Sequence, residues 1–485
     1  MRPERMSSRW ALAAVVLAVL NASGSGAEAQ APGIVQGPSM RLAGTHSFVF
    51  TPSAAGGTVN WSVDRETISD TGTSTRTNGF ASGTGTSKSF SLPAVSGFET
   101  IYYITAADHG AQDVDTVQVF PSGVRTWFTY RSAGNPDVRV YAAIPSTLSP
   151  ASKILMVMHG NSRTADEFCD IWRSWATQNN YVLLCPYYDL VNWPTTGMYQ
   201  MGNVFSGDDC GGTKNPEAQW TFTIDLGIHQ RARDGFGIVD PRFDLWGFSG
   251  GGQHVHRFML FKPDAPVRLA FACASGWYTA PDRNIDCPYG LDDPLLSFSQ
   301  QDVVDWTNKN MIIAVGTADT IRDEDLRTTA RADAQGLNRY QRADYMYSKG
   351  VALNPSTRWR RVSVAGAAHE AKLVAQGTRS LLLQAVLDSA TPEPAMKRAV
   401  VHVHPNPLVG SAMLSGEGWT GGEVTVEVFD LAGRKVGSQT ASAINGQWRF
   451  AWNSLATQGR IARGMYLVRA RDRERQAEQK VLVVE

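Results

Sequence analysis

The chain lacks an excess of charge of either sign. Lysine and arginine together number 45, and aspartate and glutamate also number 45, so the formal net charge of the 485 residues is zero. Basic patches interleaved with aromatic residues are absent as well. Because such a patch is the electrostatic footprint of nucleic-acid binding, we expect no nucleic acid as a partner and no attraction to an anionic lipid surface.

Long hydrophobic runs are lacking too, apart from a short one near the N-terminus. The apolar run Trp10–Leu20 follows arginines at positions 2, 5 and 9, and the small-residue stretch Ala27–Ala29 comes after it. The run has about half the length that a membrane-spanning helix needs. This order is typical of a cleaved signal peptide, so we expect residues 1–29 to be removed and the exported chain to have no transmembrane segment.

Cysteine is scarce, and the five cysteines are Cys169, Cys185, Cys210, Cys273 and Cys287. An exported chain can form disulfides, and an odd number leaves at least one thiol that is free or paired elsewhere. The pairs nearest in sequence are Cys169 with Cys185 and Cys273 with Cys287, but the sequence does not decide the pairing. Neither a CxxC motif nor a Cys/His cluster with zinc spacing is present, so we expect no metal site and no cofactor.

Length and pattern divide the chain, because 485 residues exceed one ordinary hydrophobic core. Residues 32–123 contain short alternating or β-branched runs between Gly- and Ser-rich turns, which predicts an immunoglobulin-like β-sandwich of unidentified ligand. The expected strands are 47–51, 58–63, 87–92, 99–105 and 115–120.

Residues 124–390 change to strands that alternate with helices. The strands are almost continuously apolar, which indicates a mostly parallel, doubly wound sheet covered on both faces, the α/β class. We expect them at 137–144, 153–158, 181–185, 243–246, 267–273, 311–315 and 358–364. Residues 391–398, with Thr391-Pro-Glu-Pro394, indicate a linker, and residues 399–485 return to a β pattern that predicts a C-terminal β-sandwich.

The pattern Gly247-Phe-Ser249-Gly-Gly251 places a serine between an apolar strand and a plausible helix at 253–261. A sharp strand-to-helix turn would lift the hydroxyl of Ser249 clear of the sheet, as a serine nucleophile requires. The alternative is a glycine-rich turn with an incidental serine. The context of a buried strand before the motif favours the nucleophile.

A serine nucleophile needs a base and an acid that orients the base. His369, in Gly366-Ala-Ala-His369, follows the last expected strand, whereas His254 and His256 lie within the helix after the serine. His369 is therefore the expected base.

Asp319, in Gly316-Thr-Ala-Asp319, follows the strand 311–315 and is the expected acid. Asp323, Glu324 and Asp325 are alternatives at the expected start of the next helix, where acidic residues favour the helix dipole without any catalysis.

Two backbone N–H groups are expected to bind the oxyanion, those of Gly250 and Asn161. Trp277 and Tyr278 follow the strand 267–273 and would lie at the carboxyl end of the sheet, where ligands bind. They are candidates for substrate binding, with ordinary core packing as the alternative. The long segment 187–212 is either a rim over the site or an exposed excursion.

With Ser249, Asp319 and His369 in this order, the middle of the chain resembles the α/β-hydrolase superfamily. The segments His159-Gly-Asn-Ser-Arg-Thr164 and Ala274-Ser-Gly-Trp-Tyr-Thr279 resemble extracellular poly(3-hydroxybutyrate) depolymerases and feruloyl-esterase-like enzymes. The resemblance implies a secreted serine carboxylic-ester hydrolase that forms an acyl-enzyme and acts on extracellular polyester or plant-polysaccharide esters. A serine peptidase of the same fold and a non-catalytic surface binding protein are the alternatives.

The tail resembles the C-terminal sorting domain of type IX secretion substrates. The similar stretches are His404-Pro-Asn-Pro407, Val428–Val436 and Gly464–Arg469. This resemblance implies the secretion machinery as a partner, followed by release or attachment to the cell surface. An accessory β-sandwich without a sorting role is the alternative.

Overall fold

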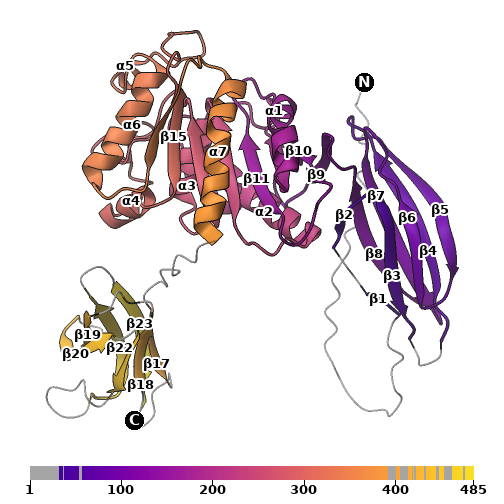
Figure 1. Cartoon of the computed structure of the whole chain (residues 1–485). Helices are drawn as coiled ribbons and strands as arrows, with labels where there is room; N and C mark the ends of the chain where they lie inside the picture. Colours follow the sequence, from indigo (N-terminus) through magenta and orange to yellow (C-terminus); the bar gives the residue numbers. More distant parts are fainter. Residues whose placement is uncertain are drawn as a thin grey trace, which may run out of the picture. The chain divides into compact units, whose positions relative to one another are not determined.

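The structure is a computed structural model, and it divides the chain into two compact units, Met1–Leu382 and Leu383–Glu485 (Figure 1). The expected signal peptide 1–29 and the linker 391–398 lie outside the described residues. The described residues are 32–35, 38–53, 57–390, 400–404, 413–417, 419, 422–430, 433–443, 447–452, 461–472 and 476–484.

The N-terminal part of the first unit contains two sheets around one apolar core. One sheet has the strand order β1-β3-β6 and the other β2-β8-β7-β4-β5. Phe50 of β3 stacks on Trp61 of β4 with 6.1 Å between the ring centres, so the core joins the two sheets. The strands are β1 (Gly33–Val35), β2 (Met40–Leu42), β3 (Gly44–Thr51), β4 (Asn60–Ile68), β5 (Ser74–Thr84), β6 (Ser87–Leu92), β7 (Glu99–Asp108) and β8 (Ala111–Phe120).

The rest of the first unit is built on an eight-stranded sheet with the order β16-β15-β14-β13-β11-β12-β10-β9. From β16 to β12 all neighbours are parallel, and β10 runs antiparallel to both β12 and β9. The strands are β9 (Thr126–Tyr130), β10 (Val138–Ala143), β11 (Lys153–Met158), β12 (Tyr181–Tyr187), β13 (Phe243–Phe248), β14 (Val267–Cys273), β15 (Met311–Gly316) and β16 (Arg360–Val364).

Helices cover both faces of this sheet, and α7 crosses in front of it in Figure 1. Trp246 of β13 packs against Trp172 of α1 and donates to Thr378 of α7, whereas Phe243 of the same strand packs against α2 and α3. Residues 243 and 246 point to opposite faces of a strand, so α1 and α7 lie on one face and α2 and α3 on the other. The helices are α1 (Ala165–Gln178), α2 (Thr221–Phe236), α3 (Gly250–Phe261), α4 (Gln300–Thr307), α5 (Ala330–Asp333), α6 (Arg339–Leu353) and α7 (Ala371–Ala390).

The second unit contains two further sheets, with the orders β17-β18-β21 and β20-β19-β22-β23. Both contribute to one buried core that includes Leu414, Val426, Trp448 and Val468. The strands are β17 (Val400–His404), β18 (Met413–Glu417), β19 (Gly422–Asp430), β20 (Lys435–Ala443), β21 (Gln447–Ala451), β22 (Gly464–Arg471) and β23 (Gln476–Val483).

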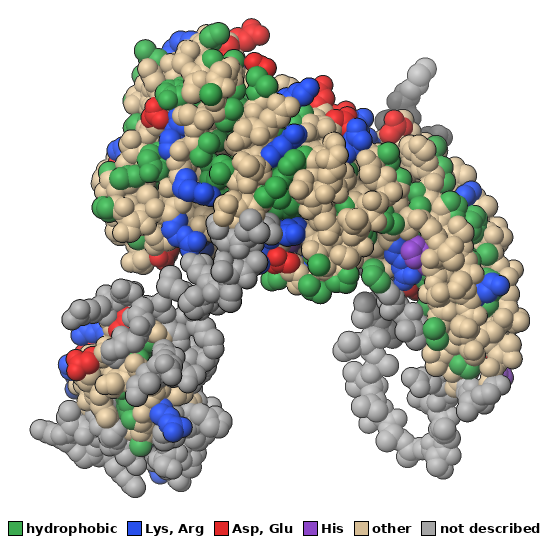
Figure 2. All heavy atoms as spheres, in the orientation of Figure 1, with side chains coloured by type: hydrophobic (Ala, Val, Ile, Leu, Met, Phe, Trp, Pro, Cys, Tyr) green, Lys and Arg blue, Asp and Glu red, His purple; other side chains and the backbone are tan. Residues whose placement is uncertain are grey.

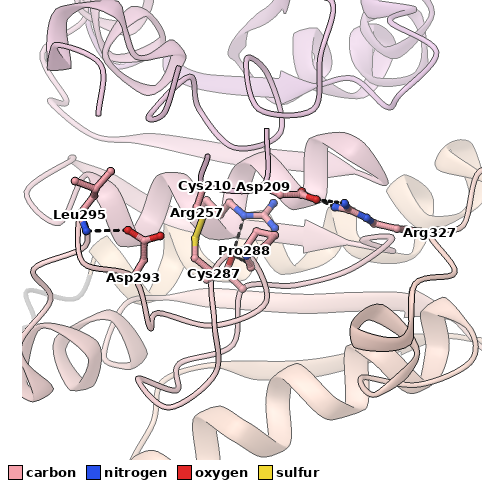
Figure 3. Close-up of a disulfide and its surroundings, with 9 residues drawn as sticks. Asp209, Cys210, Arg257, Cys287, Pro288, Asp293, Leu295 and Arg327 are labelled. Atoms are coloured by element: carbon pink, nitrogen blue, oxygen red, sulfur yellow. Dashed lines mark hydrogen bonds and ion pairs between the residues drawn. A yellow bond between two sulfur atoms is a disulfide. The ribbon is translucent and has the colours of Figure 1, made fainter. Parts of the chain in front are cut away.

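One disulfide joins Cys210 to Cys287, with 6.0 Å between the Cα atoms (Figure 3). Neither pairing of sequence neighbours forms in the structure. Cys273 is the last residue of β14, buried inside the sheet, whereas Cys287 lies on a loop that meets the segment carrying Cys210. The other two thiols, those of Cys169 and Cys185, are also buried and unbridged.

None of the helices among the described residues is long and apolar enough to cross a membrane. In Figure 2, basic and acidic side chains are scattered over the visible face rather than gathered into one region of a single sign. That distribution agrees with the zero net charge of the chain.

Candidate active site

Ser249 occupies a strained turn between β13 and α3. Its φ is 55° and its ψ is −116°, and Gly250 is the first residue of the helix. A positive φ is unfavourable for a residue with a side chain, and a sharp turn of this kind between a buried strand and a helix is the arrangement that exposes a nucleophilic serine.

The glycines after Ser249 are required by close backbone approaches. A Cβ on Gly251 would lie 2.2 Å from the carbonyl oxygen of Met158, and one on Gly252 would lie 2.5 Å from the carbonyl oxygen of Cys273. Met158 ends β11 and Cys273 ends β14, the two strands beside β13. Only glycine lets the first turn of α3 pack against both strand ends.

The three residues expected to act together form one hydrogen-bonded chain. His369 Nε2 lies 3.1 Å from Ser249 Oγ, and His369 Nδ1 lies 2.8 Å from Asp319 Oδ2. The side chain of His369 is 23% exposed and that of Asp319 is 1% exposed. With the proton on Nδ1, the imidazole donates to Asp319 and accepts from the serine hydroxyl. The nucleophilic end is therefore open and the acidic end is closed to water.

The acidic residues after Asp319 occupy a different environment from the one expected. No helix begins at Asp323, because residues 321–329 are irregular apart from a turn at 324–325, and α5 begins at Ala330. Asp323 instead pairs with Arg339, whose Nη1 and Nη2 lie 2.6 and 2.8 Å from its two carboxylate oxygens. The bonds from Arg339 lower the pKa of Asp323, although partial burial opposes the shift.

Arg339 also reaches Asp319, a contact that the sequence did not suggest. Its Nη1 lies 3.6 Å from Asp319 Oδ1, the oxygen that does not face His369. The side chain of Arg339 is completely buried. A charged residue on α6 therefore lies directly behind the acid, twenty positions along the chain from it.

The two N–H groups expected for the oxyanion lie next to each other beside Ser249. A Cβ on Gly250 would lie 3.1 Å from the backbone nitrogen of Asn161, and one on Gly160 would lie 3.7 Å from Ser249 Cβ. The first N–H groups of a helix have no acceptor within it, which applies to Gly250. Nor does the N–H of Asn161 have an acceptor among the described residues. Both donors are free to bind a developing negative charge.

A buried polar network, which the sequence reasoning missed, supports the loop that carries Asn161. His254 Nε2 lies 2.7 Å from Asp225 Oδ2 and its Nδ1 lies 2.9 Å from the carbonyl oxygen of Tyr199. The hydroxyl of Tyr199 donates to the carbonyl oxygen of His159 at 2.7 Å. The sequence places His254 on the helix after Ser249, and only the fold reveals that α2 supplies its carboxylate.

His159, the residue directly after β11, fixes the loop that follows this strand. Its Nε2 accepts from the backbone N–H of Tyr188 at 3.2 Å, and burial lowers its pKa to about 3. The imidazole is therefore neutral at any pH well above that value. It ties the end of β11 to the segment 187–212, which we call the rim segment.

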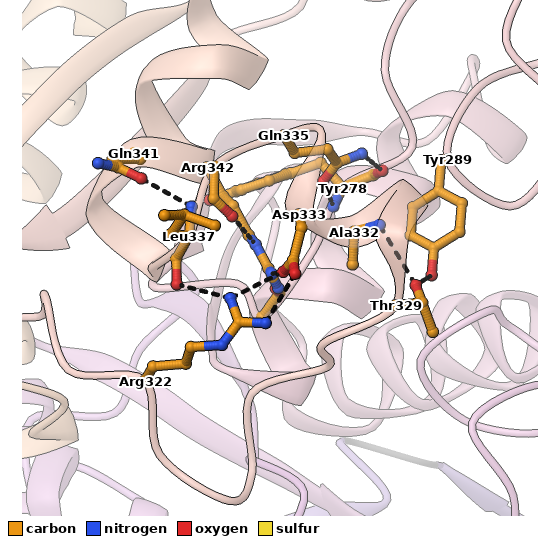
Figure 4. A network of polar contacts seen from close by, with 12 residues as sticks. Tyr278, Tyr289, Arg322, Thr329, Ala332, Asp333, Gln335, Leu337, Gln341 and Arg342 are labelled. Carbon is orange, nitrogen blue, oxygen red and sulfur yellow. Dashed lines mark hydrogen bonds and ion pairs between the residues drawn. The ribbon is translucent and has the colours of Figure 1, made fainter.

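Trp277 and Tyr278 both pack inside the unit, as the core-aromatic alternative described. Tyr278 is fully buried, and Figure 4 shows Gln335 pairing with its backbone through two hydrogen bonds of 2.9 and 2.7 Å. Trp277 is 3% exposed and has Arg257 over its ring at 4.0 Å and Arg327 at 5.1 Å. Their role in substrate binding stays a prediction.

The rim segment is attached to the rest of the unit at several points along its length. The Cys210–Cys287 disulfide joins it to the loop after β14, and Asp209 beside it pairs with Arg327, at 2.8 Å between Nη1 and Oδ1 (Figure 3). Within it, Gln200 donates from Nε2 to Asn161 Oδ1 at 2.8 Å. The rim segment therefore reaches the residues around Ser249.

Comparison with known proteins gives a match at the C-terminus and structural neighbours for the middle of the chain. Residues 402–485 match the secretion system C-terminal sorting domain. The chain is similar to poly(aspartic acid) hydrolase-1 from Sphingomonas sp. KT-1, at 29% identity and a TM-score of 0.51, covering 54% of this chain and 99% of that one. A search of curated proteins gives no match.

A second structural neighbour is a poly(3-hydroxybutyrate) depolymerase from Bordetella parapertussis. Its identity is 24% and its TM-score 0.50, covering 54% of this chain and 89% of that one. Together with the sheet order described above, these neighbours confirm the α/β-hydrolase fold. The sorting domain, of the type IX secretion system, marks the protein as secreted or attached to the cell surface.

Proposed function

We propose that the protein is a serine carboxylic-ester hydrolase that works through an acyl-enzyme on Ser249. One observation carries the proposal, the continuous hydrogen-bonded chain Ser249–His369–Asp319 at a strained strand-to-helix turn. The neighbouring free N–H groups of Gly250 and Asn161 add the oxyanion site that such chemistry needs.

In the first half of the reaction, Ser249 Oγ attacks the ester carbonyl carbon while His369 Nε2 takes the hydroxyl proton. The carbonyl oxygen becomes an oxyanion that the Gly250 and Asn161 N–H groups bind. His369 then gives its proton to the leaving alcohol, and the C–O bond of the ester breaks. Asp319 holds the imidazole in the productive tautomer and stabilises its cationic form.

In the second half, a water molecule attacks the acyl-enzyme while His369 takes its proton. The same donors bind the second oxyanion. His369 returns the proton to Ser249 Oγ as the acyl–enzyme bond breaks, so the acid is released and the serine is restored.

We propose extracellular polyesters or esters of plant polysaccharide as substrates. A poly(3-hydroxybutyrate) depolymerase among the structural neighbours and the extracellular destination support this choice. A serine peptidase is the second candidate, because the same residues cleave amides and another neighbour is named for hydrolysis of poly(aspartic acid). Release of p-nitrophenol from esters without cleavage of peptide anilides would favour the esterase.

We also propose that residues 1–29 direct export, that residues 391–398 link the hydrolase region to the C-terminal β-sandwich, and that residues 399–485 hand the chain to the secretion machinery. The match over 402–485 supports the last of these. The bounds of the expected β-sandwich, 32–123, and those of the hydrolase region, 124–390, also stay proposals.

Replacement of the nucleophile or the base tests the proposal. Ser249→Ala and His369→Ala should each lower kcat by about four to six orders of magnitude, because the three groups work as a unit. Hydrolysis of a p-nitrophenyl ester measures the loss. A serine-directed fluorophosphonate should label the native protein and leave Ser249→Ala unlabelled, which a surface binding protein without catalysis would not show. Either variant that kept most of the native kcat would refute the assignment.

A further inference from the structure

A second histidine–carboxylate pair lies on the helix that begins after Ser249 and has no part in the mechanism above. His254, in the second turn of α3, has Nε2 2.7 Å from Asp225 Oδ2 of α2, and both side chains are completely buried. Its other nitrogen, Nδ1, lies 2.9 Å from the carbonyl oxygen of Tyr199. Both ring nitrogens of His254 therefore face acceptors, whereas Nε2 of His369 faces the hydroxyl of Ser249.

The two acceptors decide where the protons of this pair lie. A carbonyl oxygen only accepts, so Nδ1 of His254 carries a proton. An ionised carboxylate also only accepts, so a further proton lies between Nε2 and Asp225 Oδ2, on one atom or the other. Without it, two lone pairs would face each other beside a buried, unpaired charge, which is costly. The pair His254–Asp225 thus holds one proton more than a catalytic pair, in which Nε2 must be free to accept.

Tyr199 connects this pair to the loop after β11. Its carbonyl oxygen accepts from His254, and its hydroxyl donates to the carbonyl oxygen of His159 at 2.7 Å. Its ring stacks on both imidazoles, with 5.2 Å between ring centres to His254 and 4.6 Å to His159. Burial raises the pKa of the Tyr199 hydroxyl, which therefore keeps the proton that it donates. Tyr199 is held by α3 on one side and bonds to the loop on the other.

The same contacts determine where the backbone N–H of Asn161 lies. Asn161 comes two residues after His159, and Gln200, the residue after Tyr199, donates from Nε2 to Asn161 Oδ1 at 2.8 Å. The backbone nitrogen of Asn161 in turn lies 3.1 Å from the position of a Cβ on Gly250. An oxyanion donor works only when it is held to within about 0.5 Å of its position. A shift of Tyr199 would therefore displace this donor.

We propose that His254 positions the oxyanion N–H of Asn161 through Tyr199, an inference that rests on the proposed esterase function. The proton that His254 shares with Asp225 keeps Nδ1 as the donor to Tyr199. His254 is a positioning residue, since it acts on the oxyanion donor through another side chain. Loss of its Nδ1 donor lowers kcat and leaves KM nearly unchanged, because the oxyanion develops only as the reaction proceeds.

Tyr199→Phe removes the bond to the loop and keeps the ring. With p-nitrophenyl butyrate, kcat should fall about 10- to 100-fold and KM should stay within about 3-fold. An alkyl trifluoromethyl ketone adds to Ser249 and places an oxyanion at the same donors, so its affinity should fall by the same factor as kcat/KM. Tyr102→Phe is the matched control, since this buried tyrosine of β7 also donates its hydroxyl to a backbone carbonyl at 2.7 Å. It should leave both measurements unchanged.

Asp225→Asn is the conservative variant of the buried pair. An asparagine can accept from Tyr188 with Oδ1, as Asp225 does at 2.7 Å, and can donate from Nδ2 to Nε2 of a neutral His254. Nδ1 then still donates to Tyr199, so kcat should stay within about 3-fold of the native value. Adding His254→Leu to Asp225→Asn removes the donor without leaving a buried charge unpaired, and kcat should then fall as it does in Tyr199→Phe.

The same substitution in the catalytic pair should have the opposite result. Asp319→Asn favours the tautomer of His369 that cannot accept from Ser249, so kcat should fall by about four orders of magnitude. An Asp225→Asn variant that lost a comparable share of its activity would overturn the shared proton.

Native kcat and native inhibitor affinity in Tyr199→Phe would overturn the positioning role, as would a rise in KM that accounts for the whole loss of kcat/KM. A lower melting temperature alone would then assign these residues to stability. If the double variant fails to unfold cooperatively, Tyr199→Phe decides, because it lacks only one oxygen atom. Failure of the esterase proposal looks different, since the native protein would then neither hydrolyse the ester nor react with a fluorophosphonate.

Discussion

Arg339 is the residue whose charge the proposed mechanism must accommodate. It lies between Asp319 and Asp323, and it is buried and paired most closely with Asp323. One cation between two carboxylates leaves a single net negative charge behind His369. That charge is the one that stabilises the protonated imidazole during turnover.

Removing the cation and removing one of the two carboxylates should shift the pH dependence of kcat/KM in opposite directions. Arg339→Gln leaves two carboxylates behind the imidazole and favours its protonated form, so the acid limb of kcat/KM should move to higher pH. Asp323→Asn leaves Arg339 with Asp319 alone, so the net charge behind the imidazole rises from −1 to zero and the acid limb should move to lower pH. At such distances each shift should be about half a pH unit or more.

A pH profile of p-nitrophenyl ester hydrolysis measures both shifts. Asp305→Asn serves as the control, because it removes one exposed charge on α4 and should leave the profile in place. Shifts of the same sign in Arg339→Gln and Asp323→Asn would show that packing, rather than charge, links these residues to the site.

For single residues, the sequence predicts those that belong to a local motif and misses those that only the tertiary structure brings to the site. Ser249 has its glycine motif, and His369 and Asp319 each follow a strand, so the structure brings all three together. Arg339 and Gln200 have no motif. They reach the site only because α6 and the rim segment fold back over the carboxyl edge of the sheet.

Among the elements, the rim segment is the one that a disulfide holds in place. The Cys210–Cys287 disulfide spans 77 positions of sequence, and the pair Asp209–Arg327 lies next to it. A separate network surrounds Asp333, the last residue of α5, which accepts hydrogen bonds from Arg322 and from Arg342 of α6 (Figure 4).

The double variant Cys210→Ser, Cys287→Ser should unfold at a lower temperature than the native protein. A disulfide that closes a loop of this length contributes about 2–4 kcal/mol by restricting the unfolded chain. Thermal and denaturant unfolding measure the loss. A reductant should lower the transition of the native protein and leave that of the variant unchanged, and equal transitions without reductant would contradict the prediction.

Strands of the central sheet were easier to predict than its helices. Residues 153–158 and 267–273 are apolar almost throughout, and β11 and β14 have these bounds. In the N-terminal part, β5 escaped notice because its residues are mostly exposed and rich in serine and threonine. Helices α2 and α6 bury arginines and a histidine, so they lack the clean apolar stripe that reveals a helix.

On the scale of the first unit, the N-terminal sheets and the central sheet share a buried interface. Phe120 at the end of β8 packs on Phe236 of α2 with 5.3 Å between ring centres, and Glu99 of β7 accepts from the Thr129 hydroxyl of β9 at 3.0 Å. Gln118 also donates to Glu99, at 2.6 Å. No pattern in the sequence indicated that these parts form one compact body.

Glu99 should make the stability of this unit depend on pH. Burial raises its pKa, although its hydrogen bonds oppose the shift, so the folded protein holds the proton more tightly than the unfolded chain does. The contribution of this group to stability is therefore greatest below its unfolded pKa, about 4.3, and declines as the pH rises through the folded value.

Glu99→Gln removes this titration while keeping an amide that can bond to its neighbours. The free energy of unfolding of the native protein should fall relative to that of the variant between about pH 4 and pH 7. Denaturant unfolding at several pH values gives the difference. A native protein that gained stability relative to Glu99→Gln over this interval would contradict the assignment.

The Cys210–Cys287 disulfide also makes the structure of the rim segment depend on the redox conditions of the compartment that holds the protein. Under reducing conditions Cys210 and Cys287 are separate thiols, and only noncovalent contacts such as the Asp209–Arg327 pair hold the rim segment. Oxidation after export joins them. An oxidising compartment, such as the cell exterior, is therefore where this covalent link is stable.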